Sequence, residues 1–67
     1  MIDARGRSCP EPVIMIKKAM ASKEAHYEMM VDNRVSVENV SRFVRHNGYD
    51  VKVEETGSEF RLQITRK

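Results

Sequence analysis

Apolar residues recur at helical spacing in two segments of the chain. Within residues 10–22, three large apolar side chains recur at helical spacing and share one face. The residues of this face are Val13, Ile16 and Met20. Residues 34–46 repeat the pattern, and their apolar face consists of Val37, Val40, Phe43 and Val44. The spacing therefore predicts two amphipathic helices, each with one apolar stripe to bury.

Residues that start and stop helices bound the second of these segments. The Asp32-Asn33 pair before it offers an N-cap, because both side chains have an oxygen that accepts from the first free N–H groups of a helix. The Asn47-Gly48 pair after it supplies the left-handed conformation in which helices commonly end. Both boundaries support a helix over residues 34–46.

Alternation and short apolar runs predict four strands. Residues 49–54 and 60–65 alternate apolar with polar side chains, so each segment predicts a half-buried strand. A turn at residues 56–58 joins the two segments as a hairpin. Residues 27–31 form an apolar run typical of a central strand, and residues 2–4 can form only a short one.

The predicted order of elements is βαβαββ, and the fold class is α/β. The last two strands each have a polar face, so helices cover one face of the sheet only. We expect a two-layer sandwich, a four-stranded mixed sheet with two helices on one face, because each helix has a single stripe and the first crossover is right-handed. The open face is expected to carry Asp50, Lys52, Arg61 and Gln63. The strand order beyond the final hairpin stays open.

Composition limits the classes of function that the fold can serve. The 67 residues make a single domain, residues 1–67, which is too small to enclose a deep pocket, so its chemistry belongs on the surface. A hydrophobic fraction of 40% with 33% charged residues fits a thin core under a charged surface. The net charge of +2 is too small to indicate a nucleic-acid partner. No apolar run approaches the roughly 20 residues that span a bilayer, so no membrane partner is expected.

A lone cysteine, Cys9, excludes an internal disulfide and suits a reducing compartment. The first residues show neither the basic start nor the apolar run of a signal peptide, so we expect a cytoplasmic location. No metal site is expected, because no two candidate ligands have helical or loop spacing. No cofactor is implied.

The motif that carries chemistry is Cys9-Pro10-Glu11-Pro12, at the entry to the first helix. Proline suits the first turn of a helix, so either Pro10 or Pro12 can begin it, with Glu11 as an alternative cap. In each case Cys9 lies within about one turn of the helix start, where the partial positive charge favours a thiolate over a thiol.

The chemistry open to a single thiolate is narrow. Thioredoxin-like exchange requires a resolving thiol, which the chain lacks. A cysteine hydrolase requires an imidazole base, and we expect His26 in a solvated loop and His46 in the last turn of the second helix. A thiolate without a base is suited to holding a transferable group. The alternative is that Cys9 is a small buried apolar residue, and residue chemistry alone does not separate the two.

Four residues near the motif are candidates for supporting the cysteine or binding a partner. Arg5 either steers an anionic group or pairs with Asp3, and Gly6 permits a turn. Ile14 and Met15 fall outside the buried stripe, one turn after the cysteine. They form either a docking patch or the edge of the core.

A longer pattern surrounds the cysteine motif. It reads Asp3-Ala4-Arg5-Gly6-x-x-Cys9-Pro10-x-Pro12-Val13, followed by Lys17-Lys18-Ala19-Met20. Further on come Val31-Asp32-Asn33, Glu38-Asn39-Val40 and Gly48-Tyr49-x-Val51-x-Val53-Glu54-Glu55. The pattern covers nearly the whole chain and resembles the TusA/SirA-like sulfur carrier family. The second half is most similar to the amino-terminal domain of YedF-type proteins, a branch associated with selenium metabolism.

This resemblance implies the same two-layer fold and a role for the cysteine. It implies that Cys9 accepts a persulfide from a cysteine desulfurase and passes it to an acceptor protein, while Pro10 and Pro12 fix the helix start. The chain is then a sulfurtransferase-like carrier rather than a stand-alone enzyme. YedF-type proteins usually continue into a second domain, so a trimmed domain and a free-standing relative both stay open.

Two alternative functions and two oligomeric states also stay open. A carrier of reduced selenium would use the same cysteine with a different donor. An RNA-binding or regulatory module would make the cysteine incidental, but ten acidic residues offset twelve basic ones and no aromatic cluster offers base stacking. Met29 and Met30 point to opposite faces of the sheet, which leaves one of them on the open face, where a dimer could form. A monomer and a weak homodimer are both compatible with this pattern.

Overall fold

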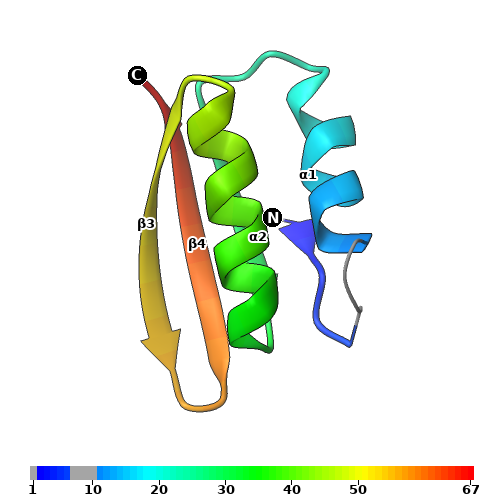
Figure 1. The fold of residues 1–67 in the computed structure, drawn as a ribbon, viewed down its shortest axis with the longest axis vertical. Helices are drawn as coiled ribbons and strands as arrows, with labels where there is room; N and C mark the ends of the chain where they lie inside the picture. The colour runs from blue at the N-terminus through cyan, green and yellow to red at the C-terminus, as the bar shows by residue number, and fades with distance from the viewer. Residues whose placement is uncertain (1, 7–10) are drawn as a thin grey trace.

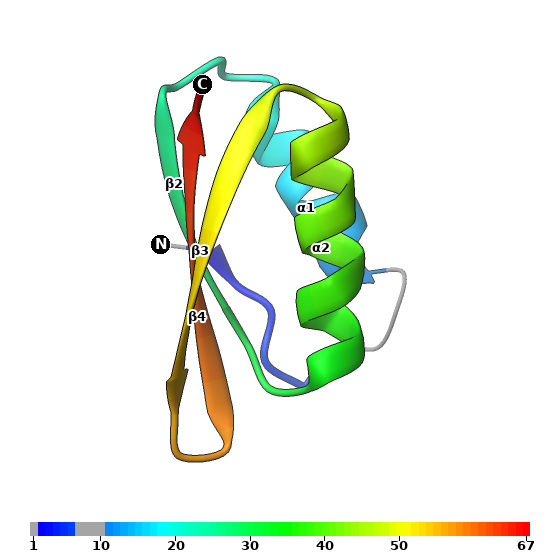
Figure 2. The same ribbon diagram turned by 60° about the vertical axis from the view of Figure 1, so that its left-hand side comes forward.

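The structure is a computed structural model that describes residues 2–6 and 11–67. Its elements are β1 (Ile2–Asp3), α1 (Glu11–Met20), β2 (His26–Val31), α2 (Arg34–His46), β3 (Tyr49–Thr56) and β4 (Glu59–Arg66). Figure 1 shows this order along the chain, and Figure 2 shows both helices on the same side of the sheet. The predicted two-layer α/β sandwich with βαβαββ order is confirmed.

The sheet has the strand order β1-β2-β4-β3, which the sequence pattern left open. β1 pairs parallel with β2, whereas β4 pairs antiparallel with both β2 and β3, so the sheet is mixed. The final hairpin turns at residues 57–58, between the paired residues Thr56 and Glu59. Gly57 has the positive φ of 65° that such a two-residue turn requires. The last strand in sequence therefore lies inside the sheet, and β3 forms its edge.

The helix boundaries follow local hydrogen bonds. The side-chain oxygen of Asn33 accepts from the N–H of Ser36 at 2.8 Å, so Asn33, the second residue of the predicted capping pair, is the N-cap of α2. α1 ends two residues earlier than predicted, because the N–H of Ala21 turns to the carbonyl of Lys18 at 3.2 Å and tightens the last turn. After α2, Gly48 has the predicted left-handed φ, at 84°.

The core lies between the helices and one face of the sheet. Its fully buried apolar side chains are Ile16, Met29, Val31, Val40, Val44, Leu62 and Ile64. Val13, Met20 and Phe43 are partly buried and pack against this cluster. On the open face Asp50 and Lys52 are exposed, as predicted, while Arg61 and Gln63 are half-buried. Within residues 2–6 and 11–67, no helix is both long and apolar enough to cross a membrane.

One strand is less buried than its alternation predicts. β3 buries Tyr49 and half-buries Val51, but Val53 is 41% exposed although it points to the helix side. The reason is position, because β3 is an edge strand with a neighbour on one side only among the described residues.

Two valines of α2 offer a matched test of this core. Val40→Ala removes buried methyl groups and is expected to lower the free energy of unfolding by about 1.5–3 kcal/mol. Val35→Ala makes the same chemical change at a side chain that is 59% exposed, so a change within about 0.5 kcal/mol is expected. Denaturant melts of both variants measure the difference. Equal losses would contradict the assignment of the buried face.

Candidate functional site

The predicted cysteine site is described through the residues on either side of it. Cys9 and Pro10 lie outside the described residues, together with residues 7–8. The other candidates, Arg5, Gly6, Pro12, Ile14 and Met15, are all described. The geometry of the site is therefore that of its two flanks, the turn that ends at Gly6 and the helix that begins at Glu11.

The first flank is fastened to β2 and to the loop after it. The N–H of Ala4 donates to the carbonyl of Met30 at 2.8 Å, and Ala4 is only 1% exposed. The N–H of Gly6 donates to Oδ2 of Asp32 at 2.7 Å. Gly6 has a φ of 77°, a conformation that favours glycine. Two hydrogen bonds to residues distant in sequence therefore hold the chain just before the cysteine segment.

Arg5 is engaged by two carboxylates. Its Nε and Nη2 donate to the two carboxylate oxygens of Asp3 at 2.9 and 3.0 Å, and its Nη1 donates to Oε2 of Glu59 at 3.1 Å. These hydrogen bonds, first to Asp3 and then to Glu59, raise the pKa of Arg5 further above its usual range. Of the two roles considered for Arg5, the structure shows the pairing role, and it adds a second partner at the start of β4.

The second flank is the first turn of α1. Pro12 is buried in that turn, where the missing N–H of proline leaves no helical hydrogen bond unmade. Ile16, one turn later, is fully buried on the same face. Glu11 begins the helix, where a carboxylate interacts favourably with the partial positive charge. The start of α1 is therefore anchored to the core by Pro12 and Ile16.

The structure separates the two apolar candidates of α1. Ile14 is 45% exposed, as predicted. For Met15 the structure shows the second of the two alternatives, the edge of the core, because Met15 is partly buried and packs against the core cluster, as does Ala19 four residues later. The buried stripe is wider than the spacing predicted, since α1 contacts α2 and Ile16 of α1 belongs to the core cluster. Ile14 alone stays available as a docking residue.

Neither histidine lies near the first flank. Asp32, which holds Gly6, directly follows β2, whereas His26 begins that strand, six residues or roughly 20 Å away. His46 ends α2, twelve residues or roughly 18 Å from the start of that helix. Among the described residues, no group of three His, Cys, Asp or Glu side chains could hold a metal ion.

Two residues of the site were missed by sequence reasoning. Asp32 was considered only as a helix cap, and Glu59 was not considered at all. Their contacts, Asp32 to Gly6 and Glu59 to Arg5, join residues 26 and 54 positions apart. Such contacts depend on the strand order, which local spacing does not reveal.

The chain is similar to known proteins in sequence and in structure. A family model described as Sulfurtransferase TusA matches residues 1–66. The chain belongs to the TusA sulfurtransferase family. A protein of Methanocaldococcus jannaschii that is named as a candidate sulfur carrier is 40% identical over 68 residues, 97% of this chain and 91% of the relative. The crystal structure of a SirA-like protein from Desulfitobacterium hafniense is 35% identical with a TM-score of 0.86, and the match covers 96% of this chain and 92% of that one.

These findings confirm the family and the fold, and they support a sulfur carrier role for this TusA-family chain. A carrier of sulfur has to meet both a sulfur donor and a sulfur acceptor.

Removing the carboxylate of Asp32 is expected to release the turn at Gly6. In Asp32→Ala the Gly6 N–H loses its acceptor, so its amide hydrogen should exchange faster, and the free energy of unfolding should fall by about 0.5–1.5 kcal/mol. Amide exchange by NMR and a denaturant melt measure the two effects. Asp50→Ala is the matched control, because this exposed carboxylate lies 3.8 Å from Lys67 on another part of the sheet. Unaltered exchange at Gly6 in Asp32→Ala would show that the bond does not hold the turn.

Proposed function

We propose that this protein carries sulfur as a persulfide on Cys9. It accepts the sulfur from a donor protein of the cysteine desulfurase class and passes it to an acceptor protein. The observation that carries the proposal is that the only thiol of a TusA-family chain lies in a four-residue segment between two anchored flanks, Gly6 and the first turn of α1. The whole unit is a single domain that acts in the cytoplasm, where a lone thiol stays reduced.

The transfer step balances without an added oxidant or reductant. The Cys9 thiolate attacks the terminal sulfur of the donor persulfide, a new S–S bond forms on Cys9, and the donor cysteine leaves as a thiolate. Delivery repeats the exchange with the acceptor thiolate as the attacking group. Because the chain has no second cysteine, the loaded Cys9 has no internal thiol that could displace the sulfur.

The flanks support this role because both ends of the segment are anchored before a partner arrives. Gly6 is held by Asp32 on one side, and Pro12 is buried on the other. Ordering a loop during binding reduces affinity, so a segment that is fixed at both ends binds at a smaller entropic cost. Arg5 contributes by tying β1 to β4 rather than by offering a free positive charge, because two carboxylates already engage it.

The positive field that favours the Cys9 thiolate comes from the start of α1, because Arg5 is already engaged by two carboxylates. Residues 9 and 10 precede Glu11, the first residue of the helix, so the free N–H groups of the first turn are those nearest to the thiolate along the chain. No imidazole base is required for this chemistry, since a thiolate is itself the nucleophile.

Sulfur loading is tested directly by intact mass. The protein is incubated with a cysteine desulfurase and free cysteine, and its mass is measured without reductant. We expect the wild type to gain one sulfur atom and to lose it again when a thiol reductant is added. Cys9→Ala is expected to gain nothing under the same conditions, because the chain then has no thiol. A sulfur gain that persists in Cys9→Ala, or no gain in the wild type, would contradict the proposal.

Docking beside the cysteine is tested at Ile14. Ile14→Ser removes an exposed apolar side chain five residues after the cysteine and is expected to slow sulfur transfer from the desulfurase about tenfold, if the side chain contributes about 1.4 kcal/mol to docking. The melting temperature should hardly change. Val53→Ser is the matched control, since Val53 is similarly exposed but lies on the strand at the far edge of the sheet. Equal transfer rates in the two variants would place the donor elsewhere.

A further inference from the structure

Within residues 2–6 and 11–67, no strand pairs with the outer edge of β3. β3 pairs with β4 on one side, and the strand order places no described strand on the other. An open edge usually carries charges or a distortion that prevents pairing with another chain. β3 carries charges, but it also exposes Val53 near its middle. Whether this edge can pair with another strand therefore depends on which charges would lie opposite its own.

Hydrogen bonds at the start of the strand show which backbone groups face outward. The N–H of Lys67 donates to the carbonyl of Gly48 at 3.1 Å, so Gly48 faces β4. In an antiparallel pair the backbone groups of successive residues face alternate sides. The even-numbered residues of β3 thus bond to β4, and the odd-numbered ones present their N–H and carbonyl groups to the outside. Val51, Val53 and Glu55 are the central members of this outward set.

We propose that this edge pairs antiparallel with β3 of a second copy of the chain, with Val53 on the two-fold axis. In this register Val53 exchanges two backbone hydrogen bonds with its counterpart, and Val51 does the same with Glu55 of the second copy. Strand pairing of this kind is an established mode of association at exposed sheet edges. It joins the two sheets into one of eight strands.

The register is selected by charge. With Val53 on the axis, Lys52 lies directly opposite Glu54 of the second copy, and this pair occurs twice. Moving the axis to Lys52 would place the two lysines against each other, and moving it to Glu54 would do the same with the glutamates. Opposite charges across two strands stabilise the pair, and like charges destabilise it. An axis at Val51 also pairs opposite charges, but it shortens the overlap to residues 49–53.

The valines and arginines of the groove between α2 and β3 also favour a second copy of the chain as the partner. Val37 and Val53 line this groove, which has a volume of about 640 Å³, and Arg42 and Arg45 flank it. Neither arginine has a carboxylate partner among the described residues. In the proposed dimer Val53 is covered by its own counterpart, so the exposed apolar residue of the edge becomes buried.

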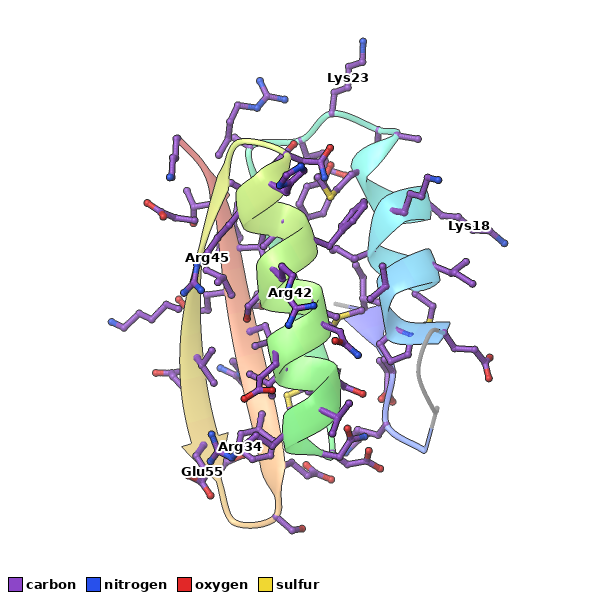
Figure 3. All side chains as sticks on the ribbon, in the orientation of Figure 1. Lys18, Lys23, Arg34, Arg42, Arg45 and Glu55 are labelled. Carbon is purple, nitrogen blue, oxygen red and sulfur yellow. The ribbon has the colours of Figure 1, made fainter. Side chains whose placement is uncertain are left out.

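Arg45 also has a counter-charge in the second copy, the carboxylate of Glu55. Figure 3 shows Arg45 beside the first half of β3, whereas Glu55 lies at the other end of the strand next to Arg34, 3.9 Å away. Because the two strands run in opposite directions, Glu55 of the second copy comes to the end of the groove where Arg45 lies. A foreign peptide would need the same spacing of valine and acidic residues, which a second copy supplies by symmetry.

The expected dimer is weak and leaves the sulfur chemistry free. Seven residues per strand bury much less than the roughly 1,600 Å² of a standard interface, so we expect a dissociation constant between about 10 µM and 1 mM. The cysteine segment follows β1, at the opposite edge of the sheet. Association and sulfur loading are therefore separate properties, and either can fail without the other.

The test is sedimentation of Cys9→Ala, which excludes dimers linked by a disulfide, at concentrations from about 10 µM to 1 mM. Reversible dimerisation that weakens at high salt is expected, because exposed ion pairs are screened. In the dimer the N–H groups of Val51, Val53 and Glu55 should gain protection from hydrogen exchange. If the protein stays monomeric at the highest concentration, this result overturns the proposal. The alternative partner of the β3 edge is then an extended segment of another protein.

Charge exchange tests the register. Lys52→Glu and Glu54→Lys should each weaken self-association about tenfold, because each places like charges opposite one another twice. An equal mixture of the two single variants should form a heterodimer, and the double variant should dimerise like the parent. Lys18→Glu, which makes the same charge change on α1, should have no effect. Stronger dimerisation of Glu54→Lys would indicate a two-fold axis at Lys52 instead. A dimer that is insensitive to all these changes would place the interface elsewhere. Either result overturns the proposal.

Discussion

The antiparallel pairing of β2 with β4 is the interaction on which the rest of this small domain depends. Its register sets Met29 beside Leu62, Tyr27 beside Ile64 and Val31 beside Phe60. These are the three cross-strand pairs that form the floor of the core, and all six side chains are buried. Both helices pack on this floor, so a shift of one strand by one residue would turn its three buried side chains to the open face.

The same register places the site. Because β2 ends beside the start of β4, the residue after it, Asp32, and the residue that begins β4, Glu59, both lie within reach of the turn at Arg5 and Gly6. The turn is therefore held by residues that also define the ends of the two central strands. The N-terminal turn is tied in this way to the two central strands of the sheet.

The sequence predicted most of the fold because its local signals agree. Both helices, the final hairpin and the single covered face follow from spacing and turn residues. The strand order did not follow, since any order of the first two strands and the hairpin buries the same apolar faces. The choice between a docking patch and the edge of the core for Met15 stayed open for a related reason. Helical spacing identifies one stripe, and the second neighbour of α1, the helix α2, widens it.

The site was predictable only in part. Family resemblance and motif spacing pointed to the cysteine segment, which stays a prediction, and the buried position of Pro12 agrees with a role in fixing the helix start. The ion pair of Arg5 with Glu59 and the bond from Gly6 to Asp32 were invisible, because they join residues that only the folded sheet brings together. The exposure of Val53 was missed in the same way, since alternation indicates a face of the sheet but not its edge.

The shortness of the segment between Gly6 and Glu11 has a consequence for how cargo travels. Only two peptide units separate residue 9 from the first residue of α1, a span of at most about 7.6 Å. Carriers that work by a long swinging arm visit several active sites while the body of the protein stays in place. A tether this short allows no such travel, so in the proposed carrier the body of the domain would have to dock against each partner to present the sulfur.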